Sequence, residues 1–206
     1  MNKIYQIKII KELEQIKDCP VCCIDNYQWT NDYRPEAYAQ IALLENEGLV
    51  VSMTAIEQNP LRRYTKENDP VYEDSGLEVF INLAPNNEKS EYMNFEMNAY
   101  GTLLSQFGTN KNRRFLSELT SRRAICEAKI SEQDWNVLLQ IPMELICEFN
   151  SGKQLKQGDK ITFNCYKISE DPSIEHYASY SPIQNPIPNF HLPQFFKEGI
   201  IGEMYE

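Results

Sequence analysis

Two stretches of alternating apolar and polar residues, joined by a polar loop, constrain the fold of this chain more than any other feature. The odd positions of residues 77–83 and 93–97 are all apolar, while most even positions carry carboxylates or amides. A period of two residues predicts β-strands with one buried face. The loop at 84–91 contains Pro-Asn-Asn, which is typical of a hairpin connection. Pairing of the strands would place four polar side chains on the opposite face: Glu78, Asn94, Glu96 and Asn98.

This polar face has two interpretations. Spacing alone favours the solvated outer surface of a sheet. The alternative is a ligand surface, because carboxylates, amides and guanidinium groups make paired hydrogen bonds to hydroxyls, and aromatic rings stack on the apolar faces of sugars. Tyr72 and Arg63 come shortly before the first strand and could join such a surface. A saccharide is therefore the candidate ligand.

The rest of the chain predicts an all-β protein. The best short helix is at 142–149, with proline in its first turn. Seven or more short strands with turns between them predict one domain over residues 1–206, an antiparallel β-sandwich. Besides the hairpin, apolar or alternating runs bounded by turn residues indicate strands at 38–44, 49–56, 124–130, 135–141 and 160–168. Residues 3–10 alternate loosely and could form an opening strand, while residues 12–17 also have helical spacing.

The C-terminal segment from Asp171 onward is dense in proline and aromatic residues. So many rings favour an ordered, irregular and non-helical segment wrapped over a sheet edge rather than disorder. The segment holds both histidines, His176 and His191, far apart and without a nearby serine or cysteine motif, so no catalytic triad is expected. We expect each imidazole to have a hydrogen-bonded structural role, with ligand contact as a second option for His191.

The balance of charge limits the partners of this chain. Its 206 residues carry 30 acidic and 20 basic side chains, a net charge of −10. This acidic character argues against binding to nucleic acid or to an anionic membrane, since both need clustered Lys and Arg. The basic run at 111–114 is expected to be a solvated loop. No apolar run is long enough for a signal sequence or a membrane span, which favours a cytoplasmic protein whose six cysteines stay reduced.

Signals for catalysis and for cofactors are weak. Glu78 and Glu96 on neighbouring strands could be the two carboxyl groups of a glycosidase, but nothing in their spacing singles them out. The chain has no phosphate-binding loop and no dinucleotide fingerprint, and its CxxC at 19–22 lacks the second pair of a typical zinc site. We expect no catalytic residue and no cofactor, although structural calcium at acidic loops such as 68–69 or 73–74 is chemically reasonable.

Six segments in order resemble the carbohydrate-binding family 9-like proteins, which are β-sandwich domains related to the family 9 carbohydrate-binding modules. The combination is specific and extends from residue 57 to residue 196. The segments are NDPVYEDSGLEVFINLAP (68–85), YMNFEMNAYGTLL (92–104), WNVLLQIP (135–142), ITFNCYKISED (161–171), HYASYSPI (176–183) and PNFHLPQFF (188–196).

This resemblance implies a non-catalytic sandwich that holds the end of a mono- or oligosaccharide between two aromatic rings, and structural calcium in some members. At the matching positions of this chain, the resemblance implies that the two rings are Tyr72 and Tyr180. Tyr180 stands where the family-like proteins commonly have tryptophan, and its smaller ring offers less stacking area. The surrounding hydrogen bonds would come from Glu78, Asn94, Glu96, Asn98 and Arg63.

Two other functions stay open from the sequence. One is a structural or protein-interaction sandwich that has lost sugar binding, and the less favoured one is a glycoside-processing enzyme. The resemblance also allows an extracellular location, in contrast to the cytoplasmic one that the N-terminal sequence favours.

Overall fold

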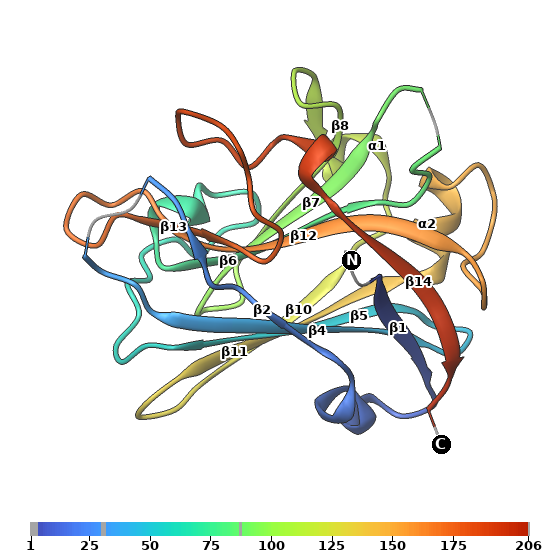
Figure 1. Ribbon diagram of the computed structural model, residues 1–206, viewed down its shortest axis with the longest axis horizontal. Coiled ribbons are helices and arrows are strands. Elements are labelled where there is room, and N and C mark those ends of the chain that lie inside the picture. Colours follow the sequence, from blue (N-terminus) through green and yellow to red (C-terminus); the bar gives the residue numbers. More distant parts are fainter. Residues whose placement is uncertain (1–3, 30–31, 87, 206) are drawn as a thin grey trace.

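The chain folds as a curled sheet of two layers that lie face to face and are joined along one side (Figure 1). The computed structural model describes residues 4–29, 32–86 and 88–205. Strands follow one another in the order β10-β11-β5-β4-β1-β14-β12-β6-β7-β8-β9, and the pair β1–β14 connects the two layers. The sandwich predicted from the sequence is confirmed, as a mixed sheet, because β1 pairs in parallel with both β14 and β4.

The first layer is called the lower layer and the second the upper layer, as they appear in Figure 1. The lower layer contains β10 (Ile125–Ile130), β11 (Trp135–Pro142), β5 (Gly48–Ile56), β4 (Glu36–Leu44), β1 (Tyr5–Ile10) and β2 (Val21–Cys23). The upper layer contains β14 (Lys197–Met204), β12 (Lys160–Ser169), β6 (Gly76–Asn82), β7 (Tyr92–Asn98), β8 (Leu103–Gly108), β9 (Arg113–Phe115), β13 (His176–Ser179) and β3 (Asn26–Tyr27). The helices are α1 (Leu116–Leu119), α2 (Met143–Phe149) and the 3-10 turns η1 (Leu13–Asp18), η2 (Val71–Glu73) and η3 (Pro193–Phe195).

The central hairpin forms as its alternation predicts. β6 and β7 pair antiparallel with Glu78 opposite Glu96 and with Val79 opposite Phe95. The odd positions of both strands enter the core between the layers, since successive side chains of a strand point to opposite faces. The four polar residues Glu78, Asn94, Glu96 and Asn98 therefore share the outer face of the upper layer.

Most other predicted elements also form. The strands expected at 38–44, 49–56, 124–130, 135–141 and 160–168 are β4, β5, β10, β11 and β12, and the short helix is α2. The tight turn between β4 and β5 includes Asn46 with φ of 61°, a conformation that asparagine tolerates well. One difference lies in the polar stretch 110–122, which contains the short β9 and α1.

The C-terminal segment is ordered, as expected, but it does more than cover a sheet edge. Its first part forms β13, and its last part, β14, lies between β1 and β12 inside the sheet. Between them the chain runs across the outer face of the upper layer (Figure 1). There Phe190 stacks on Tyr166 with 4.1 Å between ring centroids, and Phe196 packs edge-on against Phe80.

This crossing buries the polar face that spacing alone would leave in solvent. Glu78 and Glu96 are 2% and 4% exposed, and Asn94 and Asn98 are fully buried. The interpretation of this face as a solvated surface is therefore wrong. The face is buried because the tail forms a second apolar cluster with the outer side chains of the upper layer. This cluster is distinct from the core between the layers and contains Phe80, Tyr92, Tyr166, Ile168, Tyr177, Ile183 and Phe190.

A buried ionic cluster lies at one end of the sandwich. The Nζ atom of Lys167 on β12, which is fully buried, is 3.4 Å from the carboxylate of Glu57 and 2.9 Å from Nε2 of His176. Glu57 also accepts hydrogen bonds from Trp135 Nε1 at 2.9 Å and from the Ser75 hydroxyl. Lys167 and these hydrogen bonds hold the pKa of Glu57 near 2, against the burial that raises it.

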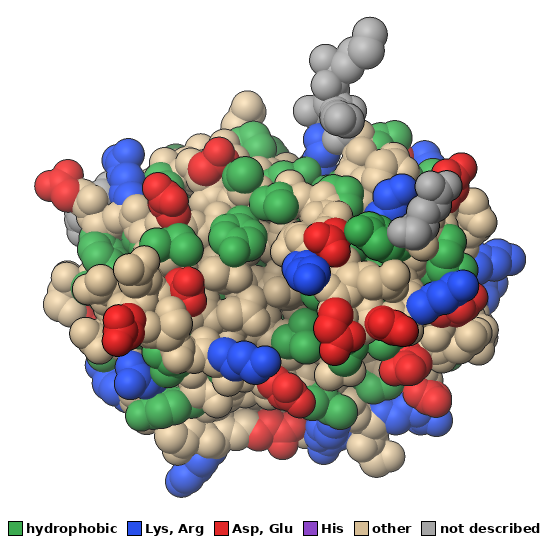
Figure 2. Space-filling view, turned by 90° about the horizontal axis from the view of Figure 1, so that it is seen from below, with side chains coloured by type: hydrophobic (Ala, Val, Ile, Leu, Met, Phe, Trp, Pro, Cys, Tyr) green, Lys and Arg blue, Asp and Glu red, His purple; other side chains and the backbone are tan. Residues whose placement is uncertain are grey.

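The outer side of the lower layer carries acidic and basic side chains interspersed with apolar ones (Figure 2). In the described part of the chain, no helix is long and apolar enough to cross a membrane.

Candidate functional site

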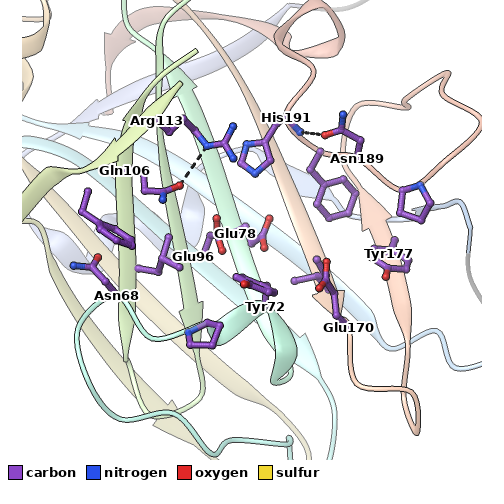
Figure 3. Close-up of a pocket in the computed structure, with 16 residues that line it drawn as sticks. Asn68, Tyr72, Glu78, Glu96, Gln106, Arg113, Glu170, Tyr177, Asn189 and His191 are labelled. Carbon is purple, nitrogen blue, oxygen red and sulfur yellow. Dashed lines mark hydrogen bonds between the residues drawn. The ribbon is translucent and has the colours of Figure 1, made fainter. Parts of the chain in front are cut away.

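A cavity of about 480 Å³ opens on the outer face of the upper layer, between the sheet and the C-terminal crossing. Its volume lies in the range typical of small-molecule sites. Strands β6, β7, β8 and β9 supply one side, η2 and the end of β12 a second, and β13 with the tail a third. The lining residues are Asn68, Pro70, Tyr72, Glu78, Glu96, Leu104, Gln106, Arg113, Phe115, Ile168, Glu170, Tyr177, Pro188, Asn189, Phe190 and His191 (Figure 3).

Two carboxyl groups lie side by side at the centre of this cavity (Figure 3). They belong to Glu78 and Glu96, which oppose each other across the β6–β7 pair. Burial, and then the like charge of Glu96, raises the pKa of Glu78 well above its usual value of 4.5. Burial also raises the pKa of Glu96 to about 7, although an Asn94 hydrogen bond and Arg113 act in the opposite direction. The two groups therefore hold protons at a pH where exposed glutamates are ionised.

Amides and a guanidinium group form the side of the cavity next to Glu96. Asn94 donates to Glu96 Oε1 at 2.9 Å and, more weakly, to Gln106 Oε1 at 3.4 Å. Gln106 also accepts from Arg113 Nε at 3.3 Å (Figure 3), and Arg113 Nη1 donates to the carbonyl of Asn110 at 2.8 Å. These hydrogen bonds fix the orientation of Arg113 at the rim of the cavity, and Glu78 takes no part in them.

Aromatic rings form the remaining walls. Tyr72 on η2 lies beside the two carboxyl groups, and Tyr177 lies on the tail side (Figure 3). Phe190 of the tail also lines the cavity. His191 stacks on Phe80 at 4.7 Å between ring centroids, and its Nδ1 lies 2.8 Å from the Tyr92 hydroxyl. Burial and the nearby Arg113 lower the pKa of His191 to about 3, so its imidazole is neutral near pH 7.

Three of the sequence-predicted site residues line this cavity: Tyr72, Glu78 and Glu96. Asn94 lies behind its wall, fully buried, and touches the site through its hydrogen bonds to Glu96 and Gln106.

Arg63 and Asn98 do not line the cavity; they meet at Asp74 instead. Arg63 contacts the buried Asp74 carboxylate at 3.1 Å and Asp171 at 3.1 Å. Asn98 donates to Asp74 Oδ2 at 2.9 Å and to the Tyr64 carbonyl at 2.8 Å. Their role as sugar contacts stays a prediction, while their observed contacts anchor η2, which carries Tyr72.

Tyr180 also lies away from this cavity. Its ring stacks on Phe163 with centroids 5.9 Å apart and packs edge-on against Tyr5, both of which belong to the core between the layers. The structure therefore does not bring Tyr72 and Tyr180 together around one cavity, and a sugar contact by Tyr180 stays a prediction. The rings that the tail contributes opposite Tyr72 are Tyr177 and Phe190.

Several lining residues escaped the sequence reasoning. Gln106 shares its face of the sheet with Asn94, its partner across β7–β8, so alternation along β8 is a signal that could have revealed it. Arg113 belongs to the basic run expected to be a solvated loop, and Glu170 and Asn189 lie in connections without periodicity. Only the folded chain brings these three to the hairpin.

Structural calcium at the acidic loops considered from the sequence stays a prediction, and carboxylates of these loops already have protein partners. Both oxygens of Asp74 already accept hydrogen bonds from Arg63, Tyr64 or Asn98. Asp69 Oδ2 accepts from the backbone of Thr65 and Lys66. Among the described residues, no group of three or more His, Cys, Asp or Glu side chains could hold a metal ion.

Comparisons with known proteins agree with this architecture. A carbohydrate-binding protein candidate from Bacteroides uniformis superposes with a TM-score of 0.79 at 23% identity, covering 98% of this chain and 100% of that one. A family 9 carbohydrate-binding module from Caldicellulosiruptor kristjanssonii, solved with cellotriose, gives a TM-score of 0.66 at 13% identity, with 98% and 95% covered. A family 9 module from the same organism, solved with glucose, gives a TM-score of 0.65 at 13% identity, with 98% of this chain and 97% of that one covered.

These structural similarities show the fold, and the family follows from the sequence. None of the curated proteins matches the chain in sequence. The model of carbohydrate-binding family 9, however, matches residues 8–201, nearly the whole chain. The resemblance seen in the six sequence segments is thus confirmed, and this protein belongs to carbohydrate-binding family 9.

Proposed function

We propose that this protein binds the end of a mono- or oligosaccharide, without catalysis, in the cavity of the upper layer. The observation that carries the proposal is the convergence of Tyr72, Phe190 and Tyr177 with carboxyl, amide and guanidinium groups around one opening. Rings offer flat surfaces to the C–H faces of a pyranose, and the polar groups offer both donors and acceptors to its hydroxyls.

The arrangement suits a polyol, whose hydroxyl groups both donate and accept hydrogen bonds. Glu78 and the Oε2 atom of Glu96 have no hydrogen-bond donor among the described residues and can accept from a ligand, and when protonated each carboxyl can also donate one hydrogen bond. Arg113 and Asn189 add donors at the rim, where Arg113 is already oriented by Gln106. Membership in carbohydrate-binding family 9, and the cellotriose and glucose in solved members of that fold, support the same ligand class.

Titration calorimetry with glucose, xylose, glucosamine and cellotriose tests the proposal. We expect binding of at least one of them by the parent protein and at least a tenfold weaker affinity for Tyr72→Ala, because the ring that lies beside the carboxyl pair is removed. Glu127→Gln, on the exposed face of β10, is the matched control and should bind like the parent. Absence of heat with every saccharide at millimolar concentration would refute sugar binding.

A second candidate function is favoured by one observation, the packing of Tyr180 against the core rather than at an open surface. It is a structural or protein-interaction sandwich that no longer binds sugar. This alternative predicts that no saccharide gives a binding signal and that Tyr72→Ala behaves as a stability variant only. Release of the aglycone from an aryl glycoside, lost in Glu78→Gln, would instead identify a glycoside-processing enzyme.

A further inference from the structure

The two central carboxyl groups of the cavity have fewer hydrogen-bond partners among the described residues than their oxygens can accept. Among the described residues, Glu78 has no hydrogen bond and no ion pair, although it is only 2% exposed. Glu96 is 4% exposed, and its Oε2 atom is buried without a hydrogen-bond partner in the described chain. Buried polar atoms are rarely left unpaired, because each costs the free energy of its lost hydration. Both residues line the cavity, so their missing partner is expected to come from a ligand.

The charges around this pair are mostly negative. Glu170 lines the same cavity, which makes three carboxyl groups against one guanidinium group. Arg113 makes no ion pair within 4 Å among the described residues, and its nitrogens are taken up by Gln106, the Asn110 carbonyl and weaker contacts. The imidazole of His191 is neutral near pH 7, as shown above. The site therefore offers more carboxyl groups, which can accept hydrogen bonds and can ionise, than cationic groups.

We infer that this cavity takes an amino sugar, a pyranose whose ring carries a protonated amine, and that Glu78 and Glu96 receive its ammonium group. An ammonium group provides three donors and a positive charge, which the two carboxylates can accept in the short, charge-assisted hydrogen bonds that are the strong ones. The inference rests on the proposed function, which it narrows from saccharides in general to one class.

A metal ion is a poorer occupant of the same position. Calcium needs six to eight oxygen ligands at 2.3–2.6 Å, and the described residues contain no cluster of three or more acidic or histidine side chains suited to a metal. An ammonium group needs only two or three acceptors, and the aromatic walls next to the pair suit the apolar face of the sugar ring.

Proton release gives the inference a signature that a neutral sugar would lack. The carboxyl pair holds protons in the free protein, because burial raises both pKa values and the charge of Glu96 raises that of Glu78 further. A bound ammonium group favours the ionised form of each carboxyl. Binding of glucosamine near pH 7 should therefore release protons into the buffer, whereas binding of glucose should release few.

The test compares glucosamine, glucose and N-acetylglucosamine by calorimetry at pH 7 in two buffers of different ionisation enthalpy. We expect glucosamine to bind about tenfold more tightly than the two neutral sugars, with heat that depends on the buffer. Glu96→Gln should reduce this preference to less than about threefold, since an amide cannot supply the negative charge, while Glu127→Gln should retain it.

The outcomes separate the two proposals. Equal affinity for glucose and glucosamine, or a preference that survives in both Glu78→Gln and Glu96→Gln, would overturn the amino-sugar assignment and leave sugar binding intact. Absence of binding by all saccharides would overturn sugar binding itself, and the amino-sugar assignment with it. Circular dichroism of each variant, matched to the parent, ensures that a loss of binding reflects the site rather than unfolding.

Discussion

Replacement of Glu96 by glutamine should reduce the stability that this protein loses as the pH rises from 5 to 8. The side chain is 4% exposed, and its pKa lies near 7 in the folded protein against 4.5 when exposed. Between these two values the folded chain binds more protons than the unfolded chain, so its stability falls as pH rises through this window. A glutamine of the same shape has no proton to lose and cannot contribute to this fall.

The magnitude follows from the same two values. At about 1.4 kcal/mol per pKa unit, ionisation of Glu96 costs the folded state about 3 kcal/mol at pH 8 and less than about 1 kcal/mol at pH 5. The advantage of Glu96→Gln over the parent should therefore grow by about 2 kcal/mol between pH 5 and pH 8. Relief of the repulsion that raises the pKa of Glu78 acts in the same direction.

Urea denaturation of the parent and Glu96→Gln at pH 5 and pH 8 measures this change. The difference between the two proteins is the relevant quantity, because other groups titrate in both. Burial lowers the pKa of His176 and of His191 to about 3, so each adds stability as pH rises from 3 to 6.5 in parent and variant alike. Glu127→Gln, which removes the same charge from an exposed position, should differ from the parent equally at both pH values.

An advantage of Glu96→Gln that is the same at pH 5 and pH 8 would refute this reasoning. It would mean that the carboxyl is ionised over the whole range, with a cation or solvent compensating it. A loss of stability on substitution at pH 8 would lead to the same conclusion. Either result would also weaken the case for a protonated carboxyl pair in the cavity.

Two further predictions concern other parts of the molecule. Lys167→Met should lower the free energy of unfolding by about 3–5 kcal/mol at pH 7, because it leaves the buried carboxylate of Glu57 without its cation. Urea denaturation measures this change, and a loss below about 1 kcal/mol would show that another group balances the charge of Glu57. Tyr180→Ala should lower stability through its lost contact with Phe163 but leave the affinity for a bound saccharide within twofold of the parent value, measured by calorimetry; a tenfold loss of affinity would instead place Tyr180 at the site.

Local sequence patterns predicted the strands well because alternation reports directly on which side chains face a core. The hairpin of β6 and β7, the pair β4–β5 and the pair β10–β11 all follow their periodicity. The parallel pairing of β1 with β14 joins residues nearly 200 positions apart, and nothing in either strand specifies such a partner. The same limit explains the polar face: its burial depends on a tail that lies about 90 residues further along the chain.

The position of Tyr180 could have been predicted from the alternation of side chains along an extended segment. Tyr177 and Tyr180 are three residues apart along one extended segment, so their side chains point to opposite faces. Tyr177 packs in the outer cluster beneath the tail, and Tyr180 packs against the core between the layers. Once Tyr177 is assigned to the outer face of the sheet, Tyr180 cannot share a cavity with Tyr72.

The tail gives the carboxyl pair its chemistry. On an uncovered sheet, Glu78 and Glu96 would be hydrated, would ionise near pH 4.5 and would attract a cation only weakly, because exposed ion pairs contribute little. The crossing of Phe190 and His191 removes most of that water, which raises both pKa values, and Glu96 Oε2 finds no hydrogen-bond partner in the described part of the chain. The free protein bears the resulting loss of stability, and a ligand that supplies donors to the pair recovers it as binding free energy. The predicted stability gain of Glu96→Gln and its predicted loss of amino-sugar preference are therefore two measurements of the same buried carboxyl group.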